Sequence, residues 1–294
     1  MTLLDYVAEQ QQFIDRTLER LIPGEQQPPE IIHRAMRYSL FAGGKRIRPI
    51  LCLAAASAVS DTAPGAEVAA CALECVHTYS LIHDDLPALD NDDLRRGRPT
   101  CHKQFGEAIA ILAGDALLTV AFQMLSEMPG ADGDRKVRLI RELSTAAGTV
   151  GGMIGGQVAD LEGERQEPTA ELLERIHRAK TGALLRASVR MGAICAGANE
   201  AQLDALTCYG EHIGLAFQIV DDILDVEQSS EALGKTAGKD AQQHKITFPV
   251  VYGLEESHRM AKEECEAARR ALEPFGERAR RLWEIAGLIV ERTK

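Results

Sequence analysis

The sequence has few aromatic residues and no excess of positive charge. Phe, Trp and Tyr together make up 4% of the 294 residues, and the formal net charge is −11. A protein that binds nucleic acid without sequence preference needs surplus Lys and Arg to neutralise phosphates. We therefore expect no nucleic-acid partner, and any phosphate site must be local.

The sequence also lacks the usual signs of export. Its first residues, Met1 to Tyr6, do not show the basic and then apolar layout of a signal peptide, and no run approaches 18 uncharged apolar residues. The seven cysteines are odd in number and scattered, so they make no disulfide framework. We expect a cytoplasmic protein without stable membrane association.

Three familiar motifs are missing as well. There is no Gly-x-x-x-x-Gly-Lys-Ser/Thr loop, no Gly-x-Gly-x-x-Gly after a strand and no Gly-x-Ser-x-Gly elbow. Nucleotide hydrolysis, dinucleotide redox chemistry and serine acyl transfer are therefore not supported.

The apolar pattern that is present is helical. Val, Ile and Thr rarely alternate with polar residues, so strands are not expected. The fold class is all-α, and the length suits one large domain over residues 1–294. Helices are predicted over 3–21, 29–41, 50–59, from 67 into an aspartate cluster at 83–93, and over 105–128, 134–163, 169–197, 200–227 and 258–272. Pro87 lies inside the aspartate cluster, and the helix that enters the cluster should end or kink there.

Two aspartate clusters each follow an apolar, helix-compatible run. The first is His83-Asp84-Asp85-Leu86-Pro87-Ala88-Leu89-Asp90-Asn91-Asp92-Asp93, and the second is Asp221-Asp222-Ile223-Leu224-Asp225. Helical residues four apart share a face, and an unpaired buried carboxylate is costly. A solvated helix end would explain either cluster alone. Two such clusters favour magnesium held by carboxylates on a phosphorylated substrate, since Mg²⁺ takes oxygen ligands and completes its shell with water and phosphate.

Two short segments are rich in cations. They are Gly43-Gly44-Lys45-Arg46-Ile47-Arg48-Pro49 and Arg95-Arg96-Gly97-Arg98-Pro99. Alone, each is typical of a solvated turn, but beside paired carboxylates each favours an anion cradle. A magnesium–diphosphate site needs metal on one side of the phosphate oxygens and organic cations on the other.

Further cations lie elsewhere. Lys235, Lys239 and Lys245 follow the second cluster, in a position that suits a lid, although loop lysines are usually solvated. His77 lies two helical turns before Asp84 and is equally consistent with a core residue or a phosphate contact.

At this point the sequence resembles the short-chain trans-isoprenyl diphosphate synthases, most closely the bacterial members that make farnesyl diphosphate. Besides the two aspartate clusters and the two cation-rich segments, the resemblance rests on Gly155-Gly156-Gln157-x-x-Asp160-Leu161, Lys180-Thr181, Phe217-Gln218, Gly234-Lys235-x-x-Gly238-Lys239-Asp240 and Lys245-x-Thr247-x-Pro249. It implies a helical bundle around a deep central cavity, a homodimer, three magnesium ions that manganese can replace, and head-to-tail joining of isopentenyl diphosphate to an allylic diphosphate.

The resemblance also implies roles for individual residues. Metal ligands are Asp84, Asp90 and Asp221, with Asp85, Asp160 and Asp225 as further candidates. The allylic diphosphate is held by Arg95, Lys180, Lys235 and Lys245, and isopentenyl diphosphate by Lys45, Arg48, His77 and Arg96. Thr181 and Gln218 present oxygen dipoles to a carbocation and, with Lys180, form the catalytic group; the released diphosphate accepts the proton.

Product length is expected to depend on Tyr79 and Ser80. Tyr79 precedes Asp84 by five residues, about 7.5 Å along a helix. From the residues alone it is equally an ordinary core tyrosine, whereas the resemblance assigns it to the floor that stops growth at farnesyl diphosphate.

Several alternatives remain at the sequence level. They are a geranyl or geranylgeranyl diphosphate synthase, a terpene cyclase and a non-catalytic regulatory subunit. The low aromatic content and the all-aspartate second cluster disfavour a cyclase. The intact clusters and the Lys45/Arg48 pair disfavour a regulatory subunit.

Overall fold

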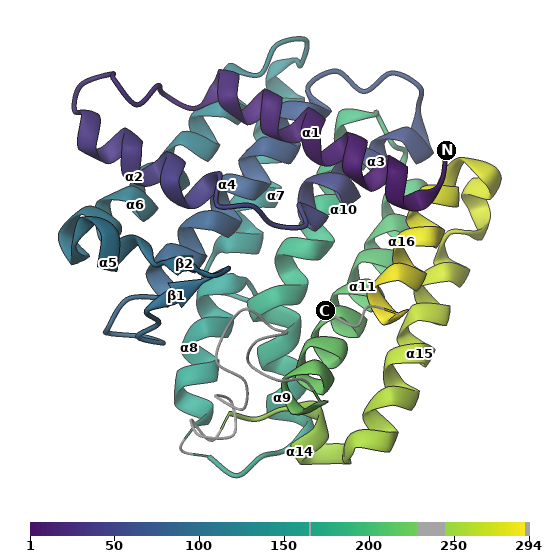
Figure 1. Ribbon diagram of the computed structural model, residues 1–294. Coiled ribbons are helices and arrows are strands. Elements are labelled where there is room, and N and C mark those ends of the chain that lie inside the picture. Colours follow the sequence, from purple (N-terminus) through teal and green to yellow (C-terminus); the bar gives the residue numbers. More distant parts are fainter. Residues whose placement is uncertain (165, 228–244, 292–294) are drawn as a thin grey trace. The chain divides into compact units, whose positions relative to one another are not determined.

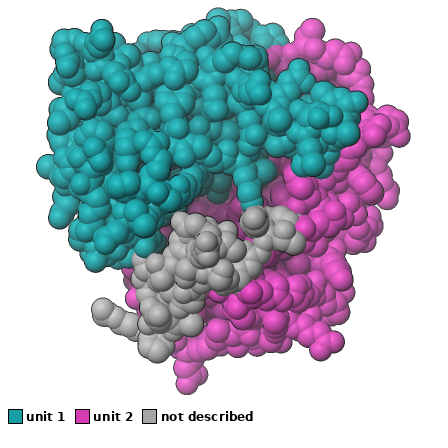
Figure 2. All heavy atoms as spheres, viewed as in Figure 1, with its two compact units in different colours: residues 1–50, 64–140 teal, residues 51–63, 141–294 magenta. Residues whose placement is uncertain are grey.

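The computed structural model describes residues 1–164, 166–227 and 245–291, and these are almost entirely helical (Figure 1). The prediction of an all-α fold is confirmed. Two compact units share the chain: unit 1 comprises residues 1–50 and 64–140, and unit 2 comprises 51–63 and 141–294, as coloured in Figure 2. That the two form one domain around a central cavity stays a prediction.

Unit 1 is built around one helix, α4. Its elements are α1 (Leu3–Leu21), α2 (Glu30–Leu40), the start of α3 (Ile47–Val59), α4 (Ala66–Asp84), strands β1 (Leu94–Arg95) and β2 (Arg98–Pro99), α5 (Cys101–Phe105), α6 (Glu107–Glu127) and the first half of α7 (Gly133–Ala147). Helices α1, α2 and α6 pack on α4. Helix α1 begins with a capping box, in which Thr2 and Asp5 each accept the other's backbone N–H.

Helix α4 is buried along most of its length because its side chains are small. Residues from Ala69 to Leu73 are fully buried, as are Cys75 and Val76. Burial raises the pKa of the Cys71 and Cys75 thiols, so both are inert apolar side chains. The helix ends at Asp84, before the Pro87 that the sequence analysis predicts as its limit.

Helix α6 meets the length and hydropathy of a membrane-spanning segment, with 39% of its apolar window buried in the protein. The core helix of a folded domain meets the same criteria. Asp115 interrupts its apolar run, and its buried side, which includes Ala110, Leu117 and Leu125, belongs to the packed interior of unit 1. The helix leaves Ile111 and Leu112 exposed.

Unit 2 holds the remaining elements. They are the rest of α3 and α7, α8 (Met153–Gly163), α9 (Ala170–His177), a π-helix (Arg178–Gly182), α10 (Ala183–Cys195), α11 (Glu200–Glu227), α14 (Phe248–Tyr252), α15 (Leu254–Ala271), a 3₁₀-helix (Glu273–Ala279) and α16 (Arg280–Glu291). The long helix α11 packs against α10, α14, α15, α16 and the π-helix. It confirms the helix predicted over 200–227.

The single helix predicted over 134–163 is wrong, because the chain breaks between α7 and α8. Gly151 has a φ of +66°, which ordinary residues rarely adopt. A Cβ at Gly152 would lie 2.4 Å from the carbonyl oxygen of Thr145. These glycines allow the sharp turn that starts α8 in a new direction.

The predicted helix over 169–197 is continuous, but its middle turn is wider than an α-helix. Residues Arg178–Gly182 form the π-helix, and such segments occur often at functional sites. The β1–β2 hairpin, α5, α14 and α16 were not predicted from the sequence. For α16 the apolar spacing of Leu282, Ile285 and Ile289 was a usable signal.

Candidate functional site

In unit 1, the loop after α4 gathers the first aspartate cluster. The N–H of Asp90 donates to the carbonyl oxygen of Asp84 at 2.8 Å, and the N–H of Asp92 donates to that of Asp85 at 3.2 Å. The loop therefore folds back on the helix end. It places Asp84 and Asp90, both predicted metal ligands, within one short turn.

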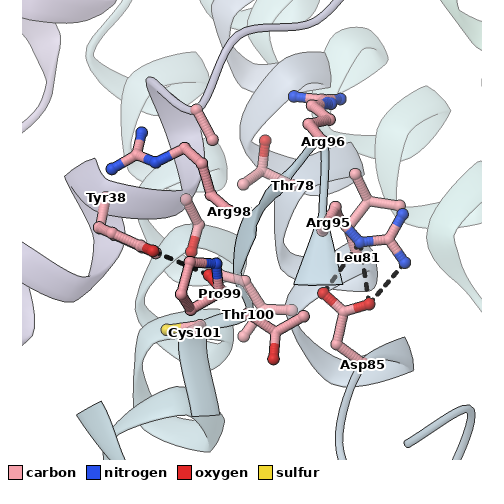
Figure 3. A pocket seen from close by; sticks show the side chains of 13 residues that line it. Tyr38, Thr78, Leu81, Asp85, Arg95, Arg96, Arg98, Pro99, Thr100 and Cys101 are labelled. Atoms are coloured by element: carbon pink, nitrogen blue, oxygen red, sulfur yellow. Dashed lines mark hydrogen bonds and ion pairs between the residues drawn. The ribbon is translucent and has the colours of Figure 1, made fainter. Parts of the chain in front are cut away.

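Asp85 differs from its neighbours because it is buried and tightly paired. The Arg95 Nε lies 2.9 Å from both carboxylate oxygens, and Nη2 lies 2.5 Å from Oδ1, as Figure 3 shows. Burial raises the pKa of the Asp85 carboxyl despite the opposing effect of Arg95. In this structure, a predicted metal ligand and a predicted diphosphate ligand bind each other.

The two cation-rich segments meet in unit 1. Arg96, in the turn of the hairpin, donates from Nη1 to the carbonyl oxygen of Gly43. A Cβ at Gly44 would lie 2.7 Å from the same nitrogen, so the guanidinium lies flat against a residue with no side chain. Arg96 is thus placed against the loop that carries Lys45 and leads to Arg48 at the start of α3, as a shared anion cradle requires.

Arg46, to which no role was assigned from the sequence, anchors the loop of Gly43 to Lys45 to the protein interior. Its buried guanidinium donates to Asp15 Oδ1 at 3.0 Å, to Glu74 Oε1 at 2.7 Å and to the carbonyl oxygen of Leu40 at 2.7 Å. Burial acts to lower the pKa of Arg46, but Glu74 and Asp15 outweigh it and raise the pKa. Its φ of +52° lets the side chain turn inward between two predicted phosphate ligands.

His77 lies on α4 near these cations. Burial, followed by the charges of Arg48 and Arg96, lowers its pKa well below the ordinary value. The imidazole is therefore neutral near pH 7 and can donate one hydrogen bond without adding charge. Ser80 donates to the carbonyl oxygen of His77 at 2.9 Å, so its hydroxyl is used within the helix.

Tyr79 is buried on the same helix, with its ring edge-on to His83 at 5.7 Å between centroids. Its hydroxyl is buried and has no hydrogen-bond partner among the described residues. Burial and the charge of Asp84 raise the pKa of Tyr79 to about 12. The side chain therefore acts as a bulky neutral group.

A small pocket behind the hairpin was not predicted. Residues from α2, α4, the hairpin and α5 line it, including Tyr38, Thr78, Asp85, Arg95 and Cys101 (Figure 3). The hydroxyl of Tyr38 donates to the carbonyl oxygen of Pro99 at 2.8 Å, and Arg98 lies over the Tyr38 ring. These contacts fix the hairpin that carries Arg95 and Arg96.

In unit 2, a glycine brings α8 against the π-helix. A Cβ at Gly156 would lie 2.1 Å from the backbone nitrogen of Lys180, so only glycine fits there. One helical turn later, Asp160 accepts a hydrogen bond from Lys180 Nζ at 2.6 Å. The motif Gly155-Gly156-Gln157-x-x-Asp160 thus serves to join Asp160 to Lys180.

Asp160 is charged despite its burial. Burial acts to raise its pKa, but Lys180, Lys245 and His177 outweigh this effect and lower the pKa below the ordinary value. The predicted site residues Asp160, Lys180 and Lys245 therefore interact electrostatically within unit 2.

Helix α11 carries the second cluster. Gln218, Asp221 and Asp225 follow a spacing of three and four residues, so they share a helix face as predicted. Gly214 lies four residues before Gln218, and a Cβ there would be 2.9 Å from the Cα of Gly182. The backbone of the π-helix, with Thr181, therefore runs close to α11.

Lys235 and Lys239, with the proposed lid, lie outside the described residues. Within the described ranges, no group of three or more His, Cys, Asp or Glu side chains forms a ready-made metal shell. Magnesium rarely needs one, because it commonly uses one or two carboxylates with water and phosphate.

Comparison with known proteins gives one family. A family model described as polyprenyl synthetase matches residues 29–277. The farnesyl diphosphate synthase of Geobacillus stearothermophilus is 48% identical over 278 residues, which cover 92% of each chain. The geranylgeranyl diphosphate synthase of Cyanophora paradoxa is 46% identical over 292 residues, which cover 99% of this chain and 96% of the relative.

A solved structure is similar over its whole length. The apo structure of an FPP/GFPP synthase from Zymomonas mobilis matches with a TM-score of 0.87 at 38% identity. The match covers 98% of this chain and 100% of the other.

Proposed function

This chain belongs to the polyprenyl synthetase family, and from that premise we propose that it joins isopentenyl diphosphate to dimethylallyl diphosphate and then to geranyl diphosphate. The proposed product is farnesyl diphosphate, with diphosphate released at each step. The allylic carbon–oxygen bond breaks first. The alkene of isopentenyl diphosphate then attacks the resulting carbocation, and a proton leaves to the released diphosphate.

One observation carries this proposal: Arg96 binds the loop of Lys45, which leads to Arg48 at the start of α3, beside a neutral His77. These groups suit a diphosphate that stays bound throughout the reaction, so we assign them to isopentenyl diphosphate. Arg donates as a planar fork and Lys as a point charge, which together match the oxygens of a diphosphate.

Unit 2 supplies most of the groups proposed for the ionising substrate, and unit 1 supplies Arg95. Lys180, paired with Asp160, and Lys245 are assigned to the allylic diphosphate, together with Arg95 and the undescribed Lys235. Thr181 and Gln218 are assigned to the carbocation, toward which their oxygen atoms present partial negative charge. No protein nucleophile is required.

The carboxylates fit a hard divalent cation. Asp84, Asp90 and Asp221 are the proposed ligands, and no soft ligand is assigned with them. Asp85, Asp160 and Asp225 are assigned to supporting positions, since the first two already pair with cations. We propose three magnesium ions, replaceable by manganese; when bound, they supply positive charge that stabilises the departing diphosphate.

We propose that the enzyme is a cytoplasmic homodimer. All seven cysteines are free, which suits a reducing compartment. Helix α6 exposes Ile111 and Leu112, and a second copy of the chain would cover them. Sedimentation of the purified protein tests the dimer, and a monomer at micromolar concentration would contradict it.

The decisive experiment is to incubate the protein with isopentenyl and dimethylallyl diphosphates and to determine product length by chromatography. A C15 product is expected. The similarity to a geranylgeranyl diphosphate synthase favours a C20 product as the second candidate. A cyclic hydrocarbon or no turnover would contradict the proposal.

A further inference from the structure

Three segments that carry proposed site residues meet at one buried cluster in unit 2. His177 directly precedes the π-helix of Lys180 and Thr181. Asp222 directly follows Asp221 on α11. Phe248 begins α14, three residues after Lys245. All three cluster residues are at most 6% exposed.

One carboxylate oxygen of Asp222 lies at the centre of the cluster. The backbone N–H of Phe248 donates to Asp222 Oδ2 at 2.9 Å. The Nε2 of His177 lies 3.2 Å from the same oxygen, but its orientation makes no hydrogen bond, and it has no hydrogen-bond partner among the described residues. The rings of His177 and Phe248 stack at 5.4 Å with an interplanar angle of 18°.

The hydrogen bond between Phe248 and Asp222 lies within a hydrophobic core, where an unpaired polar group would be destabilising. Ile176, Ile219, Ile223 and Ile246 belong to the hydrophobic core around Phe248. A buried N–H or carboxylate without a partner is costly in such a setting. The backbone of Phe248 and the side chain of Asp222 therefore stabilise each other, and the stacked ring of His177 joins the π-helix to both.

We propose that Asp222 is a positioning residue, which together with His177 and Phe248 sets the placement of Lys180 and Lys245 relative to Asp221. The inference rests on the proposed function, because it assigns the two lysines to the allylic diphosphate. Asp222 itself binds neither metal nor substrate. Of the three aspartates in the second cluster, Asp222 and Asp225 are both buried, and Asp222 is the one whose carboxylate accepts the backbone N–H of Phe248.

The test compares three substitutions at one site. Asp222→Asn keeps an oxygen that accepts the Phe248 N–H, whereas Asp222→Ala and Asp222→Leu remove it, and leucine also refills the space. Asp222→Ala and Asp222→Leu are expected to raise the KM for geranyl diphosphate at least tenfold. The KM for isopentenyl diphosphate should stay within twofold. Asp222→Asn should restore the allylic KM to within threefold of wild type.

A matched control separates positioning from general destabilisation. Tyr209, also on α11, donates a buried hydrogen bond to the carbonyl oxygen of Leu282 at 2.9 Å. Tyr209→Phe should lower the melting temperature without changing either KM. Should Asp222→Ala and Asp222→Leu fail to fold, His177→Leu is the replacement, with an expected allylic KM increase of at least threefold.

Distinct outcomes overturn the two proposals. An inactive wild-type enzyme contradicts the proposed function. If the wild type is active, the positioning role is contradicted by either of two results for Asp222→Ala and Asp222→Leu. These are an unchanged KM for geranyl diphosphate, or equal increases in KM for both substrates. Asp222 is a metal ligand if isothermal titration of Asp222→Asn with magnesium and inorganic pyrophosphate shows the same loss of metal binding as Asp221→Asn.

Discussion

The two units support their site residues with buried charges of opposite sign. In unit 1, the guanidinium of Arg46 donates hydrogen bonds to a carboxylate on α1, a carboxylate on α4 and a backbone carbonyl on α2. In unit 2, the carboxylate of Asp222 accepts a hydrogen bond from a backbone N–H of α14 and lies close to His177 at the end of α9. Each buried residue lies beside a proposed ligand in sequence, namely Lys45 and Asp221.

The difference follows from what each group supports. Arg46 has donors directed at three separate elements, so it can fix a loop with an unusual backbone. Asp222 is short and lies on a regular helix, so it fixes how neighbouring segments dock on that helix. Loop sites thus rely on a multivalent side chain, and helical sites rely on a compact one.

The largest expected effect is a loss of turnover when either of two aspartates, one from each unit, is removed. Asp84→Ala and Asp221→Ala should each lower kcat by roughly 10²–10³-fold, as for other losses of transition-state charge stabilisation. The helical circular dichroism should persist, because both side chains are only partly buried. Steady-state kinetics check this, and near-normal turnover in one variant would remove that aspartate from the proposed metal ligands. Excess chelator should abolish wild-type turnover.

The second effect concerns the buried cation. Arg46→Ala leaves Glu74 buried without its partner, so we expect a loss of about 3–5 kcal/mol in the free energy of unfolding. Urea denaturation measures it. Arg259→Ala in unit 2 is the control: that arginine forms exposed ion pairs with Glu256 and Glu263, and little change is expected. Equal losses would contradict the contrast between buried and exposed pairs.

The assignment of the two diphosphates to different lysines gives the third effect. Lys45→Ala should raise the KM for isopentenyl diphosphate, and Lys180→Ala the KM for geranyl diphosphate, each by an amount equivalent to about 1.5–3 kcal/mol. The exposed Lys262→Ala should change neither. If both variants affect both substrates equally, the two diphosphate assignments are wrong.

Product length should respond to unit 1 through Tyr79. Tyr79→Ala opens space near Asp84, and we expect products of twenty carbons or more at a total rate within about tenfold of wild type. Tyr79→Phe is the matched control. It keeps the ring and removes a hydroxyl that has no partner among the described residues, so C15 should remain the product. Chromatography of the products distinguishes the two outcomes.

The smallest effect is on the pH dependence of stability. The pKa of His77 is lowered in the folded state, so below about pH 6.5 the unfolded chain binds a proton that the folded protein does not. Stability should therefore fall as the pH drops through that region, by at most about 1.4 kcal/mol per pH unit. His77→Gln should flatten this slope between pH 7.5 and 5.5. Thermal melts at the two pH values measure the difference.

Helical positions were predicted well from the sequence because spacing determines them. The faces of α11 and the end of α4 follow from apolar periodicity and from Pro87. The break before α8 was missed, since the pair Gly151-Gly152 beside apolar residues does not by itself reveal a φ of +66°. The assignments of Lys45, Arg96 and Lys180 came from motifs, and their functional roles stay predictions.

Arg46 and Asp222 were not predicted, for a common physical reason. Each belongs to a motif whose neighbours are proposed ligands, and nothing local distinguishes a buried charge from an exposed one. Their partners, Glu74 and Phe248, are 28 and 26 residues away. Only the tertiary structure shows which charge of a cluster faces inward.

Arg96 illustrates an evolutionary consequence of the hairpin. It has a φ of +53° and precedes Gly97 at +73°, a turn in which asparagine or glycine is the usual first residue. An arginine strains the backbone there, whereas the proposed function needs its charge. Selection for thermal stability and selection for turnover therefore act in opposite directions on the same codon.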